Sequence, residues 1–319
     1  MKAMICTAYG PPEVIQVGEL PKPTPTGNQI LIRVRAAAVT ISDCIVRSGK
    51  VKPLLWLPMR LFVGFTRPRN QVLGLDLAGE VVAVGGAVRR FQVGDPVMAF
   101  AGKHFGAYAE YVCLPADGVR GPQDALVAPK PANLDYAEAA TLPSRGGLAW
   151  HFLGQGQVQA GQRVLVFGAS GATGTFATQL AHHLGAQVTG VCSTANRDLV
   201  KSLGAETVID YTRQDFTQRP ERYDLIFDAV GKRYSQRIAY RTALAPNGKF
   251  ISVDDGTPQL GIDTLVQLKA LVEAGHLKPV IDRVYPLEQT AEAHRYVETG
   301  HKRGNVVIAI TGPNYESER

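Results

Sequence analysis

Hydrophobic and polar positions follow one pattern in the first part of the chain and a different pattern after it. Up to residue 114, short β-like runs such as 29–34, 77–84 and 108–114 alternate with turn residues. Gly79 and the Gly85-Gly86 pair interrupt these runs. Short apolar runs with glycine breaks are typical of a curved, mostly antiparallel sheet. We therefore predict a β-rich first domain.

From Arg163 onward, apolar strands alternate with amphipathic helices. The predicted strands are 164–167, 187–191, 207–209, 225–229 and 249–253. The predicted helices are a short one at 136–142, then 175–184, 197–203 and 234–244, and one near 262–274. Alternation of this kind predicts a doubly wound parallel sheet with helices on both faces. A last strand at 306–310 is predicted to rejoin the first domain.

Composition and charge limit the classes of protein. The 319 residues suffice for two domains, and 45% of them are hydrophobic, as in an ordinary globular protein. The formal charge of +6 suits a phosphorylated ligand, and because no basic run is interleaved with aromatics we expect no nucleic-acid partner. The apolar stretch 53–65 is too short for a membrane helix and contains Pro58 and Arg60. It is expected either to cap the β domain or to form the lip of an apolar substrate pocket.

The four cysteines are dispersed. None forms a C-x-x-C pair, which excludes a cysteine-rich zinc lobe, and the beginning of the chain does not resemble a secretory signal. Reduced thiols in the cytoplasm are therefore expected.

The sequence GASGATG at 168–174 joins a predicted buried strand to a predicted helix. It fits the pattern G-x-G-x-x-G, with Ala169 in the first position and Gly171 and Gly174 in the other two. Gly171 would let the backbone approach a diphosphate, and Gly174 would let the helix pack closely on the strand. The alternative is a tight turn without a ligand. We predict a dinucleotide site.

The end of the second strand indicates which dinucleotide binds. An NAD-preferring site usually has Asp or Glu there, whereas this chain has Ser193 and Thr194, followed by Arg197 and Lys201. Hydroxyls and cations suit a 2′-phosphate, so NADP(H) is the predicted cofactor. A solvated helix face is the alternative explanation for the two cations.

Taken in order, several segments make the chain similar to a known family, the zinc-free quinone oxidoreductase branch of the medium-chain dehydrogenase/reductase superfamily, which includes zeta-crystallin. The segments are AAVTISD (37–43), RSG (47–49), GLDLAGE (74–80), FQVGDPV (91–97), GAYAE (106–110), GASGATG (168–174), GAETVIDY (204–211), DAVG (228–231) and GHKRGNVV (300–307). The resemblance implies a GroES-like catalytic domain formed by 1–125 and 276–319. It also implies a Rossmann domain at 126–275 and a cofactor in the cleft between the two domains.

The resemblance also implies roles for individual residues. Zinc-dependent relatives have Cys at the position of Thr40 and His at that of Leu75, so no metal is expected. Thr40 and Ser42 are the candidate donors to a substrate oxyanion, beside the cofactor's own ribose hydroxyl, Tyr108 and Arg145. Asp43 is expected to be a helix N-cap rather than an acid. The expected cofactor-binding residues are Gly168, Ser170, Gly171, Ala172, Thr173, Ser193, Thr194, Arg197, Lys201, Tyr211, Gly231, Ser252, Val253 and Asn305.

The segment that follows Val253 is shorter than in the family. Relatives have an additional helix and strand before the helix that matches 265–274, whereas here only 254–263 precede it. We therefore expect a sheet truncated to five strands, a monomer or an altered homodimer, and a more open active site. The implied activity is zinc-independent, NADPH-dependent reduction of quinones or α,β-unsaturated carbonyls. The alternative is a non-catalytic NADPH-binding sensor or structural protein.

Overall fold

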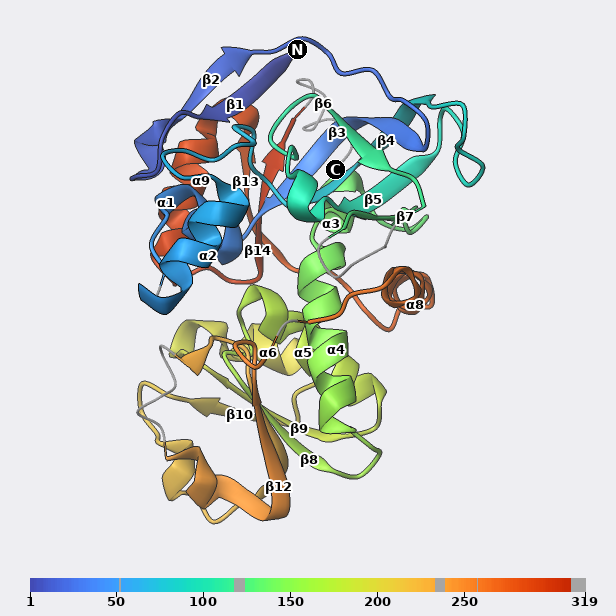
Figure 1. The fold of residues 1–319 in the computed structure, drawn as a ribbon. Helices are drawn as coiled ribbons and strands as arrows, with labels where there is room; N and C mark the ends of the chain where they lie inside the picture. Colours follow the sequence, from blue (N-terminus) through green and yellow to red (C-terminus); the bar gives the residue numbers. More distant parts are fainter. Residues whose placement is uncertain (52, 118–123, 233–238, 257, 311–319) are drawn as a thin grey trace. The chain divides into compact units, whose positions relative to one another are not determined.

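The computed structural model describes residues 1–319 except 52, 118–123, 233–238, 257 and 311–319 (Figure 1). The chain forms two compact units. Unit 1 comprises Met1–Pro143, Gly261–Lys269 and the chain from Ile281 onward; unit 2 comprises Ser144–Leu260 and Ala270–Val280. The domain limits predicted at 125/126 and 275/276 remain predictions.

Unit 1 is built on a sheet in the order β13-β14-β3-β4-β5-β7, with β6 also paired to β3, and on a separate β1–β2 hairpin. Its strands are β1 (Lys2–Cys6), β2 (Ile15–Glu19), β3 (Gln29–Val39), β4 (Asp76–Val84), β5 (Pro96–Phe100), β6 (Tyr111–Pro115), β7 (Leu126–Pro129), β13 (Ile281–Pro286) and β14 (Asn305–Ala309). Its helices are α1 (Ile41–Ser48), α2 (Pro53–Val63), α3 (Tyr136–Ala139) and α9 (Thr290–Glu298), with 3-10 turns η1 (Pro12–Val14), η2 (Gly102–His104) and η7 (Leu287–Gln289).

The sheet of unit 1 bends where the sequence predicts curvature. The β3–β4 register shifts twice, between Leu31 and Ile32 and between Val34 and Ala36. A Cβ on Gly79 would lie 2.2 Å from the carbonyl oxygen of Arg33, so only glycine permits this close crossing. The last strand rejoins this sheet as predicted, because β14 pairs antiparallel with β3.

The described residues of unit 2 form a five-stranded parallel sheet in the order β10-β9-β8-β11-β12, in agreement with the predicted five strands. Its strands are β8 (Arg163–Phe167), β9 (Gln187–Cys192), β10 (Thr207–Asp210), β11 (Tyr223–Asp228) and β12 (Leu244–Ser252). Its other elements are α4 (Gly147–Gly156), α5 (Ala172–His183) and α6 (Arg197–Ser202), with 3-10 turns η4 (Thr194–Asn196), η5 (Phe216–Gln218) and η6 (Tyr240–Ala243). The π-turn η3 (Leu142–Gly146) and helix α8 (Ile262–Glu273) each include residues of both units.

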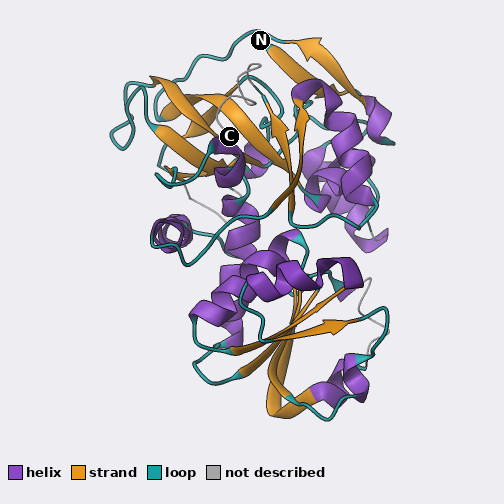
Figure 2. Cartoon of the chain, turned by 180° about the vertical axis from the view of Figure 1, so that it is seen from behind, coloured by secondary structure: helices purple, strands orange, loops and turns teal. Residues whose placement is uncertain are grey.

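Both faces of the parallel sheet are covered (Figure 2). Phe227 packs on Phe152 of α4 with ring centroids 5.9 Å apart. Its neighbour Ile226 points to the opposite face, because side chains alternate along a strand, and joins a buried cluster that contains Phe216. The continuous apolar runs of the sequence are therefore explained by burial on two sides.

Several predicted elements differ from the structure, among them the strands predicted at 249–253 and 29–34, which are observed at 244–252 and 29–39. The helix predicted at 136–142 ends at Ala139 and is followed by η3, since Pro143 has no N–H to donate within a regular helix. The strand predicted from Tyr108 begins at Tyr111. The helix predicted at 234–244 lies partly outside the described residues, and its described end forms η6 and the start of β12. No described helix is long and apolar enough to span a membrane.

Candidate nucleotide-binding site

The carboxyl ends of the five parallel strands bring most of the predicted cofactor residues to one edge of unit 2. The strand order reverses direction at β8, because β9 lies on one side of it and β11 on the other. In open α/β sheets, ligands bind outside the carboxyl ends of the strands at such a switch point. Asn305 is the exception among the predicted residues, since it is the buried first residue of β14 in unit 1.

The turn between β8 and α5 has the backbone that a diphosphate requires. Gly168 has a φ of 79°, and a Cβ there would lie 2.3 Å from Cγ1 of Val230. A Cβ on Gly174 would lie 2.1 Å from the carbonyl oxygen of Gly168, so α5 packs against the turn at a distance only glycine allows. A Cβ on Gly171 would meet only that oxygen, at 3.3 Å. Packing within the protein therefore requires glycine at 174. At Gly171 the protein makes only one tight contact, so packing alone does not explain this glycine.

Helix α5 presents uncapped amides at this turn. Gly171 is its N-cap and supplies no side-chain cap, so the first amides of the helix, at Ala172 and Thr173, have no intrahelical acceptor. The positive end of the helix dipole lies at the same point. Free amides and a partial positive charge at a helix start form a site suited to a phosphate anion.

Asn196, which the sequence reasoning did not select, connects two predicted residues. Its Nδ2 lies 3.2 Å from Oγ of Ser170 and 3.2 Å from Oγ of Ser193, and it donates to both. The β8–α5 turn is thereby tied to the end of β9. The signal was present in the sequence as an amide three residues after Ser193, in the turn that precedes α6.

Thr194 has a partner that the sequence reasoning also missed. Its hydroxyl donates to Oδ2 of Asp210 at 2.5 Å, and the same carboxylate accepts from the Thr212 amide and hydroxyl at 3.0 and 2.7 Å. These bonds, with that from Thr194 the strongest, lower the pKa of Asp210. A carboxylate therefore lies at the end of β10, next to the end of β9, where the sequence has no carboxylate. It already accepts a hydrogen bond from the Thr194 hydroxyl.

The predicted cations and Tyr211 are at the surface of unit 2. Arg197 and Lys201 are exposed on α6, and neither forms an ion pair with a described carboxylate. Tyr211 is 55% exposed, and its amide donates to the carbonyl oxygen of Cys192 at 3.1 Å. These three side chains are accessible to a ligand.

On the other side of β8, the ends of β11 and β12 are joined by Asp228. One carboxylate oxygen accepts from the Gly231 amide at 3.1 Å, and the other accepts from the hydroxyl of Ser252 at 2.9 Å. The Val253 amide donates to the Asp228 carbonyl oxygen at 3.0 Å. Gly231, Ser252 and Val253 are thus brought together, and the Ser252 hydroxyl proton is already donated to this carboxylate.

In unit 1, Thr40 is the N-cap of α1 and is buried. Its amide and hydroxyl donate to Oδ2 of Asp43 at 2.8 and 2.6 Å, and the Asp43 amide donates back to the hydroxyl at 3.4 Å. The expectation that Asp43 is the N-cap is therefore wrong, because Asp43 is the third helical residue and closes a capping box. Ser42 is partly buried in the first turn of α1.

A buried polar group lies beside this helix. The sulfur of Cys44 is 3.4 Å from Nδ1 of His294, whose ring packs edge-on against Tyr108 at 5.6 Å. Burial, with a smaller contribution from Arg47, lowers the pKa of His294 to about 3, while burial raises the pKa of Cys44. Both groups are therefore neutral near pH 7, and the pair is not a thiolate–imidazolium pair of the kind that activates a nucleophilic cysteine.

The positions that hold zinc in zinc-dependent relatives offer little to a zinc ion in this chain. Leu75 has no donor atom, and the Thr40 hydroxyl is committed to the capping box. Among the residues that the structure describes, no group of three or more His, Cys, Asp or Glu is placed to hold a metal ion. The donor set does not fit the thiolate and imidazole ligands of a catalytic zinc.

Comparison with known proteins agrees with this geometry. Residues 26–122 match the alcohol dehydrogenase GroES-like domain, and residues 172–272 and 257–308 match two zinc-binding dehydrogenase models. The chain is 33% identical to the NADPH-dependent alkenal/one oxidoreductase, chloroplastic, of Arabidopsis thaliana, over 97% of this chain and 79% of that protein. The 2-methylene-furan-3-one reductase of Solanum lycopersicum is equally similar, at 33% over the same shares.

A solved structure, that of the quinone oxidoreductase from Coxiella burnetii, superposes with a TM-score of 0.85 at 31% identity, covering 98% of this chain and 99% of that one. The family models match segments of both units, and the relatives align along nearly the whole chain. The protein therefore belongs to the medium-chain dehydrogenase/reductase superfamily of oxidoreductases, with quinone and alkenal oxidoreductases among its relatives.

Proposed function

We propose that the protein is an NADPH-dependent reductase of quinones and α,β-unsaturated carbonyls that works without a metal ion. One observation carries the proposal: the first amides of α5 are uncapped, and a Cβ on Gly171 beside them would meet only the Gly168 carbonyl oxygen, at 3.3 Å. A diphosphate fits that arrangement, and the printed names of the relatives include an NADPH-dependent alkenal/one oxidoreductase.

The chain offers a distinct group for each part of the cofactor. The amides of α5 would hold the diphosphate, while Ser170 and Ser193, fixed by Asn196, would lie along the adenosine side. Arg197 and Lys201 are the exposed cations for the 2′-phosphate. Gly231 and Val253 would border the nicotinamide side, and a role for Asn305, which belongs to unit 1, stays a prediction from the sequence. When bound, NADPH supplies a hydride for an electron-poor carbon.

The substrate class follows from the lack of fitting zinc ligands at the positions of Thr40 and Leu75. Quinones and enones delocalise the negative charge that develops on reduction, so hydroxyls, amides or water suffice to stabilise it. A simple aldehyde would need a stronger electrophile, and the residues at the zinc positions do not fit one. The Thr40 hydroxyl already donates to Asp43 at 2.6 Å, so its main effect is to position the first turn of α1. Thr40 and Ser42, at the start of α1, stay the proposed donors to the substrate oxyanion, beside the cofactor's own ribose hydroxyl.

The test is NADPH oxidation by a panel of quinones and enones, followed as loss of the nicotinamide near-ultraviolet absorbance, with and without a chelator. Turnover with NADPH that exceeds turnover with NADH and survives chelation is expected. Tight NADPH binding without turnover of any substrate would instead favour the non-catalytic sensor or structural role. Loss of activity on chelation, restored by zinc, would contradict the metal-free proposal.

Two remaining aspects are also proposals. Strand β12 is the edge of the described parallel sheet, so we propose a monomer or an altered homodimer, to be checked by light scattering on the full chain. We propose a cytoplasmic location and no nucleic-acid partner. The names of some relatives include chloroplasts or mitochondria, so the location should be checked by microscopy of a fluorescent fusion.

A further inference from the structure

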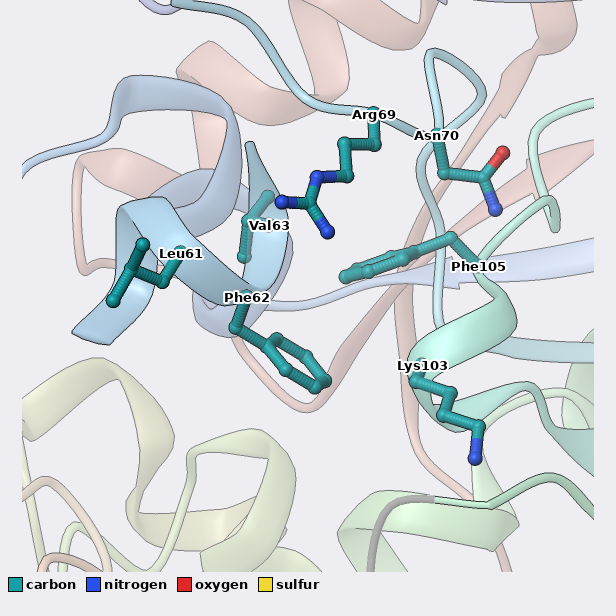
Figure 3. Close-up of a pocket in the computed structure, with 7 residues that line it drawn as sticks. All are labelled: Leu61, Phe62, Val63, Arg69, Asn70, Lys103 and Phe105. Atoms are coloured by element: carbon teal, nitrogen blue, oxygen red, sulfur yellow. The ribbon is translucent and has the colours of Figure 1, made fainter. Parts of the chain in front are cut away.

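Unit 1 contains an open cavity of about 470 Å³ beside the segment 53–65, which the sequence predicts either to cap the β domain or to form the lip of an apolar substrate pocket. It lies between the end of α2, the chain that follows α2, and η2. Its lining residues are Leu61, Phe62, Val63, Arg69, Asn70, Lys103 and Phe105 (Figure 3). The volume is within the range of small-molecule sites, which combine apolar walls with a few polar groups.

The apolar wall of the cavity continues onto an exposed surface. Val63 and Phe105 are 8% and 7% exposed, whereas Leu61 and Phe62 are 59% and 50% exposed. Trp56 and Leu57, earlier in α2, and Phe65, just after it, are also exposed. Phe105 holds a φ of 52°, which is uncommon for a non-glycine residue and which places its ring in the wall. Exposed apolar side chains therefore lie on the same segment as the cavity wall.

One cation in the cavity is available to a ligand. Arg69 is exposed and forms no ion pair with any carboxylate in the described part of the chain, and its amide is fixed by the carbonyl oxygen of Val63 at 2.7 Å. Figure 3 shows the Arg69 side chain and the rings of Phe62 and Phe105 converging on one space, while Lys103 points away from Arg69. Lys103 is paired with Asp124.

The surrounding sequence favours an anion. Between Cys44 and Leu75 there is no Asp or Glu, whereas six residues are basic: Arg47, Lys50, Lys52, Arg60, Arg67 and Arg69. Arg47 is neutralised by Glu298, and Arg60 is stacked on Tyr9 with its guanidinium 3.7 Å from the ring centroid. Arg69 is the guanidinium of this group that lines the cavity, and a guanidinium binds a carboxylate with two parallel hydrogen bonds.

We propose that this cavity binds a small anionic amphiphile, a carboxylate on an unbranched or aromatic apolar body, with Arg69 holding the carboxylate and Phe62 and Phe105 enclosing the body. The site goes beyond the proposed reductase activity and needs neither NADPH nor turnover. It can therefore stand if the reductase proposal fails, and the reverse also holds.

The test is isothermal titration of the full chain with dodecanoate below its micelle concentration, with dodecanol as the neutral probe of equal length. Dodecanoate is expected to bind, and dodecanol to bind at least about tenfold more weakly, because the alcohol lacks the charge-assisted bonds. Arg69→Gln should weaken dodecanoate binding by about tenfold. The matched control is Arg67→Gln, an exposed neighbour that removes the same charge but does not line the cavity, and it should change binding less than about twofold.

Three results would overturn the proposal. Equal losses in the two variants would mean that general surface charge attracts the probe. Equal affinity for dodecanol would mean that no anion site exists. Retention on anionic phosphatidylglycerol vesicles with no binding of monomeric dodecanoate would mean that the exposed α2 surface docks on a membrane instead. Unfolding curves of both variants should match that of the wild type, since both side chains are exposed.

Discussion

The two glycines of the β8–α5 turn should respond differently to the same added carbon. Gly171 has an extended backbone, with φ −79° and ψ 174°, so a side chain there causes no backbone strain. Its Cβ would lie 3.3 Å from the Gly168 carbonyl oxygen, a tight contact that a shift of a few tenths of an ångström relieves. Gly171→Val should therefore keep the free energy of unfolding within about 1 kcal/mol of wild type. Its branched methyls would occupy the proposed diphosphate space, so NADPH affinity should fall by at least about tenfold.

Gly174→Ala tests the other requirement. Its Cβ would lie 2.1 Å from the Gly168 carbonyl oxygen and 2.9 Å from Cα of Ala169, so α5 must move away from β8 by roughly 1 Å to restore normal contact. Overpacking of this kind costs about 1–3 kcal/mol. The free energy of unfolding, measured by urea titration, should decrease. The NADPH dissociation constant, measured by protein fluorescence, should increase. Normal NADPH binding by folded Gly171→Val would refute the placement of the diphosphate.

Three further predictions concern other groups. His294 has a pKa of about 3 in the folded chain and about 6.5 in the unfolded chain. Protonation therefore favours the unfolded chain: the free energy of unfolding is unaffected above pH 6.5 and decreases as the pH falls toward 3. In urea unfolding, the free energy of unfolding of the wild type should fall by about 2–3 kcal/mol between pH 7 and 4.5 through this group, and His294→Gln should lack that decrease. Equal pH dependence of the free energy of unfolding in the two proteins would contradict a buried neutral imidazole. Thr40→Ala should lose about 1 kcal/mol of stability through its cap, with kcat reduced less than about tenfold; a hundredfold fall in kcat that Thr40→Ser does not show would make Thr40 the oxyanion donor. Arg197→Gln should raise KM for NADPH by about tenfold and leave KM for NADH nearly unchanged in steady-state assays; parallel changes would remove Arg197 from the 2′-phosphate.

Much of the fold follows from local patterns in the sequence. Strands buried on two faces must be apolar throughout, so 164–167 and 225–229 are recognisable without a structure, and the observed strands lie within two residues of them at each end. Two glycines of 168–174 likewise follow from local geometry: Gly168 has a φ of 79°, which few other residues adopt, and Gly174 packs too closely on the turn for a side chain. The segment after Val253 is short compared with that of the family the chain resembles, and this comparison predicted a sheet of five strands.

Local patterns were less informative where one residue has several possible neighbours. The sequence shows Thr40 and Asp43 three residues apart, but either one can cap a helix, and the structure shows that Thr40 does. The helix predicted at 136–142 fails for a local reason that was underestimated, since Pro143 interrupts the hydrogen-bond pattern.

The chain by itself determined which segments become strands and helices and where a phosphate can approach the backbone, because those properties depend on residues adjacent in sequence. Only the tertiary structure decided which side chains meet across strands. Asp210 reaches Thr194 from the neighbouring strand end, and Asp228 joins the ends of β11 and β12. Arg69 converges with Phe105 although 36 positions separate them in the numbering. Such contacts depend on strand order and on close packing between distant segments, which are properties of the whole sheet and are not encoded in any one stretch of sequence.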